Sequence, residues 1–465
     1  MKRTLFLGFA LALCAGCANH RAQTFRMPPS EVAPSPEVTP APDEVAAGPS
    51  QPVNLQVLPR ENKPLTLERA LRLTREHHPD LAVSGFELRA REAAELQAGV
   101  LPNPELEIEL ENFAGGRGFG GLGGTETTLA LGQVIELGGK RAKRKRAAAF
   151  DSALARWEYE RKRLDVRAAT TKAFIRALAA QEKVALHEEL AALAERMQRV
   201  VAARVTAGKV SPLEAAKTEV IHASALLELQ QARREQEVNR LLLAASWSDS
   251  SPRFDRVSGS LAEIRDLPPL GALENLLEHT PDLARWATIT EERQARLALA
   301  KTKPIPDLTL KGGVRYLRDA GTETYVAGLS FPLPMFNRHR GTILQAQNQL
   351  FKARTEAGGA RSEAAVSLAT TYQNLQAARE RVRTIEERIL SGSQRAFDGI
   401  NEGYREGKFA LLEVLDTQRT LFEAKQRYLE AQAEYHLLQT DLERLIGRQL
   451  FASERGERAE DHHEN

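Results

Sequence analysis

The chain has 465 residues, of which 42% are hydrophobic, 6% aromatic and 27% charged. Few aromatic and many charged residues suit long solvated helices better than the thick interior of a large globular domain. The formal net charge is only +2, which argues against nucleic acid as a partner.

The N-terminus has the pattern of a secretory signal. Lys2 and Arg3 precede a short apolar run and then small residues. The run ends at Cys17 in a sequence that resembles a bacterial lipoprotein signal, so we assign residues 1–17 to the signal and expect Cys17 to be acylated. Cys14 stands where such signals usually have Leu, and plain signal cleavage is the alternative. The residue after Cys17 is not Asp, which resembles lipoproteins sorted to the outer membrane of Gram-negative bacteria.

The rest of the sequence lacks the pattern of a membrane-spanning helix. No later stretch reaches the roughly eighteen continuous apolar residues that such a helix needs. If the mature chain crosses a membrane, it must do so as β-strands in a closed barrel, because lipid leaves open sheet edges unpaired. No cysteine follows Cys17, so we expect a fold without disulfides.

The sequence repeats itself after a Pro-rich stretch. Pro79 returns as Pro281 at an offset of 202, and Gly208 returns as Gly407 at an offset of 199. Two copies of one unit are therefore predicted. The predicted domains are a signal (1–17), a Pro-rich tether (18–64), repeat 1 (65–266), repeat 2 (267–450) and a polar tail (451–465).

Each copy contains two segments with strand periodicity. In the first copy, residues 105–111 alternate Glu with Leu or Ile, and a Gly-rich loop (115–124) leads to a second strand at 125–137. In the second copy, residues 307–316 alternate in the same way and a return strand follows at 323–331. Segments of about ten residues suit tilted membrane strands. A soluble hairpin is the alternative.

Long helices are predicted for most of the remainder. Residues 140–206 contain neither Pro nor Gly, so one helix of about 100 Å is expected at about 1.5 Å per residue. Its partner begins near Pro212, where Pro suits the first helical turn. The predicted heptad seams are Leu186, Leu190, Leu193, Met197 and Val200 in the first copy, and Ile385, Ile389, Gly392, Ala396 and Ile400, then Leu415, Phe422 and Leu429, in the second.

Four strands cannot close a membrane barrel, since the smallest known barrels need about eight. Strands from several chains must then be pooled, and oligomerisation becomes obligatory. The predicted fold is mainly α with a membrane β-barrel, and the attached long helices continue it as a helical tube.

Two segments carry a family resemblance. Residues 404–409 (Tyr-Arg-Glu-Gly-Lys-Phe) and 411–419 (Leu-Leu-Glu-Val-Leu-Asp-Thr-Gln-Arg) resemble the TolC family of outer-membrane efflux factors, and the resemblance extends over residues 65–447. It implies a homotrimer with a twelve-stranded barrel and an α-helical barrel, docked through a periplasmic adaptor protein to an inner-membrane pump. Residues 207–214 and 331–338 are similar to the CzcC-type branch, whose pumps of the RND type export heavy metals.

The resemblance also implies an aperture at the periplasmic entrance. Its acidic residues attract cations and repel one another, so closure needs counter-charges. Phe409 replaces an arginine that ties neighbouring coils together in the family, which leaves Lys408 as a substitute. Ordinary solvated helix charges are the alternative. The expected aperture residues are Tyr404, Glu413 and Asp416, with Glu214 and Lys217 through the internal repeat and Lys408 beside them.

The helical tips are expected to meet the adaptor, because family members expose small and apolar residues there. An uncontacted loop is the alternative. The expected docking residues are Gly208, Lys209, Ser211, Leu213, Gly407, Leu411 and Leu412.

A dense basic run at residues 140–146 is expected at the junction of barrel and helices, facing water or anionic head groups. A merely solvated helix face is equally consistent with it. The histidines form no spaced ligand set, so no metal site is predicted, and the tail pair His462 and His463 reads as part of a polar tail. No nucleophile elbow, phosphate loop or dinucleotide fingerprint occurs, and neither catalysis nor a cofactor is expected.

The sequence therefore predicts an outer-membrane channel for efflux of divalent heavy-metal cations, with energy supplied by the inner-membrane partner. The same channel serving drug efflux or type I secretion is one alternative. A periplasmic coiled-coil scaffold without a pore is another.

Overall fold

The computed structural model describes residues 64–113 and 124–451. The predicted signal lies outside these ranges. The tether, the Gly-rich loop and the tail also lie outside them, apart from one residue of each.

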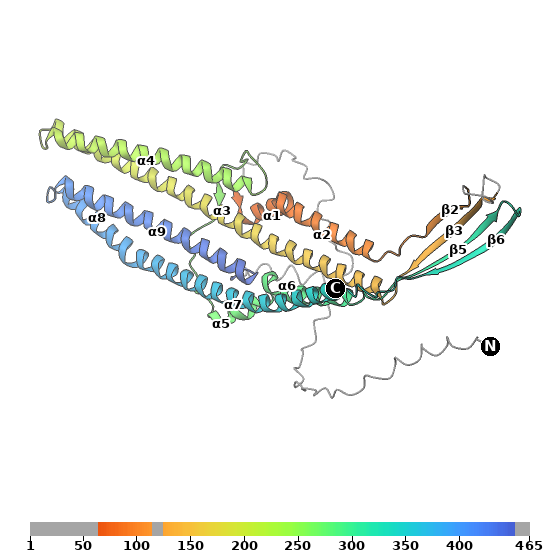
Figure 1. The fold of residues 1–465 in the computed structure, drawn as a ribbon. Coiled ribbons are helices and arrows are strands. Elements are labelled where there is room, and N and C mark those ends of the chain that lie inside the picture. Colours follow the sequence, from red (N-terminus) through yellow and green to blue (C-terminus); the bar gives the residue numbers. More distant parts are fainter. Residues whose placement is uncertain (1–63, 114–123, 452–465) are drawn as a thin grey trace, which may run out of the picture. The chain divides into compact units, whose positions relative to one another are not determined.

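The described chain is mostly helical, with one four-stranded sheet and one short two-stranded pairing (Figure 1). In chain order the elements are β1 (Leu65–Thr66), α1 (Leu67–His77), α2 (Pro79–Ala98), β2 (Glu105–Glu111), β3 (Glu126–Ile135), α3 (Lys140–Thr206), α4 (Pro212–Ala245), β4 (Val257–Ser258), α5 (Leu270–Leu277), α6 (Pro281–Ala300), β5 (Leu308–Leu317), β6 (Thr322–Ser330), α7 (Arg340–Thr384), the π-turn η2 (Ile385–Leu390), α8 (Ser391–Arg405) and α9 (Leu411–Ile446).

The predicted order of strands followed by two long helices is confirmed in both halves of the described chain. Two helices precede each strand pair, α1 with α2 and α5 with α6, and they are separated at Pro79 and Pro281. Each Pro takes the first position of the second helix, because it lacks the N–H that a helix interior would need. His78 caps the first of these breaks by accepting the Asp80 N–H at 3.1 Å.

The sheet has the strand order β2-β3-β5-β6, and every neighbouring pair is antiparallel. Strands β2 and β6 form its two edges, and neither outer edge has a partner within the described residues. At the centre β3 and β5 approach closely. A Cβ on Gly313 would lie 2.3 Å from the Leu129 carbonyl oxygen, so only glycine fits there.

Pairing places the alternating side chains on two chemically different faces. One face carries the Glu row of β2 beside the charged and small residues of the other strands. The opposite face is apolar and exposed to an extent that folded soluble domains avoid. Its large exposed side chains are Leu106, Ile108, Leu110, Leu129, Leu131, Ile135, Leu310, Val314, Tyr316, Tyr325 and Leu329.

The predicted 67-residue helix is confirmed, since α3 spans Lys140–Thr206. Its predicted seam is partly wrong. Met197 is buried, but Val200 is 49% exposed, and the buried positions near it are Ala194 and Val201. Small alanines occupy most of the contact with α4, because closely packed helices leave little room between their backbones. Among the described helices, none is both long and apolar enough to span a bilayer.

A π-turn shifts the buried seam of the second copy. Ile389 was expected on that seam but is 39% exposed. Leu368, Leu375 and Val382 lie seven residues apart on α7, and all are fully buried. The next seam residue is Leu390 rather than Ile389, because η2 inserts one extra residue into the helix. The seam then continues seven residues apart at Phe397 and Tyr404. In the returning helix Phe422 and Leu429 are buried as predicted, and Leu415 is half-buried.

The connection between the repeats, residues 246–269, is fixed onto the long helices. Gln181 of α3 accepts the Val257 N–H at 3.1 Å and donates to the Val257 carbonyl at 3.3 Å. Tyr435 of α9 accepts the Arg265 N–H and donates to the Arg265 carbonyl at 3.3 and 3.2 Å. Parallel pairing of β1 with β4 joins the start of the first repeat to the same connection.

Arg444 joins the end of α9 to both halves. Its guanidinium contacts Asp165 of α3 and Asp282 of α6, each at 2.5 Å, and its side chain is 18% exposed. Burial disfavours the charged form, but the two carboxylates outweigh burial and raise the pKa of Arg444.

Arg444→Met is expected to lower the free energy of unfolding by about 1–2 kcal/mol, because it leaves two partly buried carboxylates without their partner. Thermal unfolding in detergent, followed by far-ultraviolet circular dichroism, measures the shift. Arg448→Met is the control, since Arg448 is exposed and no ion pair holds it within the described chain. Equal midpoints for the two variants would contradict the assigned role.

Candidate functional site: the helical tips

Both helical hairpins turn at a Gly-Lys pair. Gly208 and Gly407 have φ values of +68° and +80°, the left-handed conformation that favours glycine after a helix end. The Lys209 N–H donates to the Arg204 carbonyl at 2.9 Å, and the Lys408 N–H donates to the Gly403 carbonyl at 2.8 Å. The repeated pair is therefore a helix C-cap that leaves both lysine side chains at the tip.

The returning helices are capped by residues that the sequence placed at the tips. Ser211 accepts the Leu213 N–H at 3.2 Å, with Pro212 in the first turn of α4. Glu413 reaches back to accept the Ala410 N–H at 2.9 Å in the first turn of α9. Glu413 thus has a structural role as an N-terminal cap in addition to its exposed charge.

Tyr404 lies inside the tip. It is 5% exposed, and the Arg204 guanidinium carbon of α3 lies 4.6 Å from its ring centroid. The contact ties one helical hairpin to the other, with a cation over an aromatic face. Phe409 covers Gly403 so closely that a Cβ on Gly403 would lie 2.3 Å from the ring.

The other expected aperture residues lie on the surface of the tips. Lys217, Lys408, Glu413 and Asp416 are exposed, and Glu214 is half-buried. Lys408 pairs with Glu406 of its own turn at 2.5 Å. Of the six expected residues, Lys217 and Asp416 line one common groove.

Most of the expected docking residues are exposed, including Leu213 and Leu412 at 64% and 69%. Leu411 is the exception, at 6% exposed. It packs into a cluster with Val414 and Leu421. The adjacent leucines alternate between surface and interior because one helical residue turns the side chain by about 100°.

A groove of about 850 Å³ lies between the hairpin α3–α4 and helix α9, near the tips. Its walls are mainly aliphatic, with charged residues along both rims. The lining residues are Leu186, His187, Leu190, Leu213, Ala216, Lys217, Val220, Ile221, Ser224, Ala225, Glu228, Leu412, Leu415, Asp416, Gln418, Arg419, Phe422, Glu423 and Gln426.

Two polar groups in the groove lack hydrogen-bond partners within the described chain. Gln418 is 4% exposed, and its buried Oε1 receives no hydrogen bond. The buried Nδ1 of His187 makes no hydrogen bond, and Glu228 lies 3.6 Å from it. Unpaired buried polar atoms are costly, so the groove is suited to a partner that supplies a donor.

Sequence reasoning missed the contact of Arg204 with Tyr404, which joins the two hairpins. It also missed His187 and Gln418, whose unpaired polar atoms line the groove. None of the three has a distinctive spacing. Only the Gly-Lys and Ser-Pro pairs had a local signal, because capping chemistry is contained within a few residues.

The basic run at the start of α3 serves chiefly inside the chain. Arg144 donates to the Ala98 and Val100 carbonyls at 2.8 and 3.2 Å, and Arg141 donates to the Gly99 carbonyl at 2.6 Å. Cations at the last carbonyls of α2 complement the negative end of that helix. Lys140 also pairs with Asp307 at 2.8 Å. Arg141, Lys145 and Arg146 are exposed, as expected for a run that faces water, whereas Lys140 and Arg144 are half-buried. The expectation is therefore wrong only for Lys140 and Arg144.

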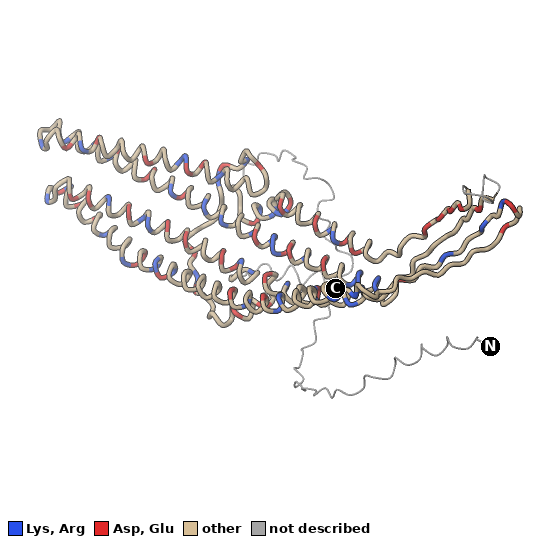
Figure 2. Tube along the Cα trace, in the orientation of Figure 1, with Lys and Arg blue, Asp and Glu red and all other residues tan. Residues whose placement is uncertain are grey.

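The polar face of the sheet carries an acidic row along β2 (Figure 2). Lys311 of β5 crosses the small residues of β3 to reach Glu107 at 2.5 Å. Arg315 makes the corresponding contacts to Glu111 and Glu126 at 3.0 and 2.9 Å. Glu105 and Glu109 have no ion pair within the described chain, so the face stays net acidic.

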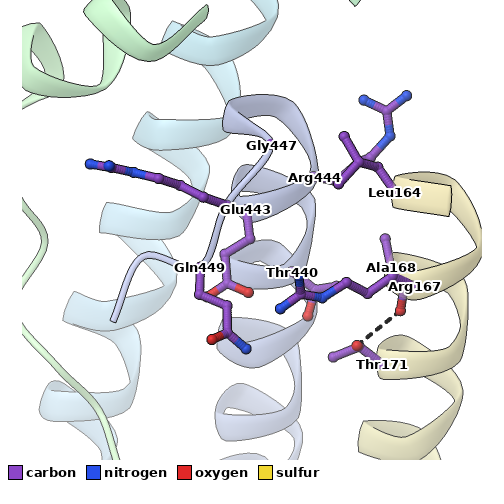
Figure 3. A pocket seen from close by; sticks show the side chains of 10 residues that line it. Leu164, Arg167, Ala168, Thr171, Thr440, Glu443, Arg444, Gly447 and Gln449 are labelled. Atoms are coloured by element: carbon purple, nitrogen blue, oxygen red, sulfur yellow. Dashed lines mark hydrogen bonds between the residues drawn. The ribbon is translucent and has the colours of Figure 1, made fainter. Parts of the chain in front are cut away.

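Other recesses lack the chemistry of a site. The recess in Figure 3 lies between α3 and α9, where Arg167 and Thr171 face Thr440 and Glu443. It is small, and Arg444 beside it already holds two carboxylates. In the described ranges no three His, Cys, Asp or Glu residues are grouped to hold a metal ion. His462, His463 and Cys17 lie outside those ranges.

Comparison with known proteins follows the duplicated organisation. The family model for outer membrane efflux protein matches residues 70–248 and 272–448, one segment in each repeat. The cobalt-zinc-cadmium resistance protein CzcC of Cupriavidus metallidurans is 34% identical over 394 residues, which cover 84% of this chain and 92% of CzcC. The nickel-cobalt-cadmium resistance protein NccC of Alcaligenes xylosoxydans xylosoxydans is 27% identical over 279 residues, 59% of this chain and 62% of NccC.

The fold is also similar to a solved structure of CusC. The TM-score is 0.72 at 14% identity, and the match covers 86% of this chain and 97% of CusC. The duplicated strands and hairpins, together with the family match over both repeats, lead to one conclusion. This chain belongs to the outer membrane efflux protein family.

Proposed function

We propose that the chain is the outer-membrane channel of a tripartite efflux system that exports divalent heavy-metal cations. The observation that carries this proposal is a four-stranded sheet with two open edges, one acidic face and one exposed apolar face. Similarity to CzcC supports the cobalt, zinc and cadmium class as cargo.

The sheet supports assembly of three copies into a twelve-stranded barrel. Closing the open edges pairs every backbone group, which a lipid environment demands. The apolar face then contacts lipid, and the row of glutamates on β2 lines the lumen. A net acidic lumen favours cations over anions.

The helical hairpins extend this barrel through the periplasm as a second tube. At about 1.5 Å per residue, the 67-residue helix α3 is about 100 Å long. An acylated Cys17 would anchor the chain to the outer membrane, and the tether (18–64) would give the anchor reach. Energy comes from an inner-membrane pump of the RND type, since the channel itself is proposed to have no enzymatic activity.

The tips form the periplasmic entrance in this proposal. Three copies of Glu413 and Asp416 near one axis would attract cations and repel one another. Lys217 lines the same groove as Asp416 and is one available counter-charge. Tyr404 acts from inside the tip by holding the hairpins together through Arg204.

Asp416→Asn and Glu413→Gln are each expected to raise single-channel conductance in planar bilayers and to weaken cation preference. Glu413→Gln keeps an acceptor for the Ala410 N–H, so the helix cap survives while the charge is lost. Lys425→Gln serves as a control, because Lys425 pairs with Glu189 away from the tips. Unchanged conductance and reversal potential in both tip variants would refute the aperture.

The adaptor is proposed to dock on the exposed tip residues and in the adjoining groove. An apolar helix that brings a hydrogen-bond donor would satisfy Gln418 and cover Leu213 and Leu412. The mixed charges on the rims would set its orientation.

Val220→Glu is expected to weaken adaptor binding at least tenfold, since it places a carboxylate in an apolar wall. Val238→Glu on the same helix is the matched control, because Val238 is also exposed and lies outside the groove. Surface plasmon resonance with the adaptor of the same efflux system measures both affinities. Equal weakening by the two changes would argue against the groove.

Deletion of the gene is expected to sensitise the bacterium to zinc, cadmium and cobalt, with complementation by the intact gene. Growth inhibition across zinc, cadmium, cobalt, nickel, copper and several antibiotics measures the range. Sensitivity confined to antibiotics would favour drug efflux. A purified chain that gives no conductance would favour the scaffold without a pore.

A further inference from the structure

Exposed apolar side chains continue past the helix-facing ends of the two edge strands, β2 and β6. After β6, residues 331–336 include Phe331, Leu333, Met335 and Phe336, which are 49%, 68%, 66% and 99% exposed. We call residues 331–336 the exit segment. On the other edge, Leu101 before β2 is 57% exposed and Leu106 within β2 is 66% exposed, and we call residues 100–108 the entry segment.

Prolines stop the hydrogen-bonded ladder at both places. Pro332 and Pro334 follow β6, and Pro102 and Pro104 precede β2. Since proline has no N–H, residues 331–334 after β6 and residues 101–104 before β2 cannot extend the sheet by regular pairing. A neighbouring chain can therefore be bound at these stretches only through side-chain contacts.

The direction of the strands decides which segments meet. β6 runs toward the helices and β2 runs away from them, and they occupy opposite edges of the sheet. Closing the sheet with a second copy places β6 beside β2 of that copy, antiparallel. The exit segment then continues alongside the entry segment of the neighbouring copy.

The charges near the two segments are complementary. Arg338 and Arg340 follow the exit segment and have no hydrogen bond or ion pair from their side chains within the described chain. Glu105 in the entry segment also has neither there. Glu105 has only a longer-range electrostatic interaction with Lys311. Basic and acidic side chains without a hydrogen bond or ion pair inside the chain suit a contact between copies.

We propose that the exit segment of one copy packs on the entry segment of the next and seals the base of the barrel. Met335 and Phe336 supply the apolar contact against Leu101 and Leu106 of the neighbour. Arg338 and Arg340 lie near the acidic start of β2. The inference rests on the proposed barrel and adds a specific interface to it.

Cysteine cross-linking tests this contact. Leu106→Cys with Met335→Cys is introduced into one chain, and membranes are treated with a short flexible bis-maleimide before denaturing electrophoresis. Leu110→Cys with Leu329→Cys is the reference pair, because it reports closure between β2 and β6 themselves. Leu106→Cys with Val366→Cys is the negative control, since Val366 is 65% exposed but lies along α7.

Covalent dimers and trimers are expected for the test pair and the reference pair, with monomer alone for the control. If the reference pair links and the test pair does not, the proposed interface is wrong while the barrel stands. Quenching of a fluorophore at Met335→Cys by nitroxide lipids would then identify lipid as the occupant. If neither pair links, the barrel and this interface both fail.

Discussion

A sheet of four strands with two open edges and one apolar face cannot be stable in water or lipid as a single copy. Each unpaired backbone group on the outer edges of β2 and β6 needs a partner, and the exposed side chains of the apolar face need an apolar environment. The two edge strands of one chain, β2 and β6, run in opposite directions, so β6 of one copy can pair antiparallel with β2 of another. Assembly of identical copies therefore satisfies the constraint without any new element.

The helical part connects the sheet to the tips. Gene duplication gives two hairpins of similar length, and the connection between repeats is held on α3 and α9 by Gln181 and Tyr435. One π-turn keeps Phe397 and Tyr404 on the buried seam, so the second hairpin can contact the first through Arg204. The groove lies between the first hairpin and α9, with Lys217 on α4 and Asp416 on α9.

Local chemistry made much of this fold predictable. Alternation of Glu with Leu and Ile placed β2, the absence of Pro and Gly placed α3, and the Gly-Lys pairs placed both turns. The seam positions Val200 and Ile389 were wrong, because helix packing and an inserted residue shift the phase without a sequence signal. The basic run was misread in part, since Arg144 and Arg141 donate to backbone carbonyls at and after the end of α2.

The candidate site was predictable in part from the internal repeat and the family resemblance. They led to Ser211 and the two glycines at the tips, where the capping geometry agrees with them. The contact of Arg204 with Tyr404 joins helices far apart in sequence, and no spacing links the two residues. The unpaired groups of Gln418 and His187 come together only in the groove between α3, α4 and α9. Leu411 shows the limit most simply, because its neighbour Leu412 has the same chemistry and faces outward.

The mass of the purified mature protein tests the central claim most directly. Native mass spectrometry of the detergent-extracted outer membrane fraction should give a complex of three chains that loses solubility when detergent is removed. A monomer that stays soluble in detergent-free buffer would contradict the account, because its open strand edges and apolar face would then need no partner.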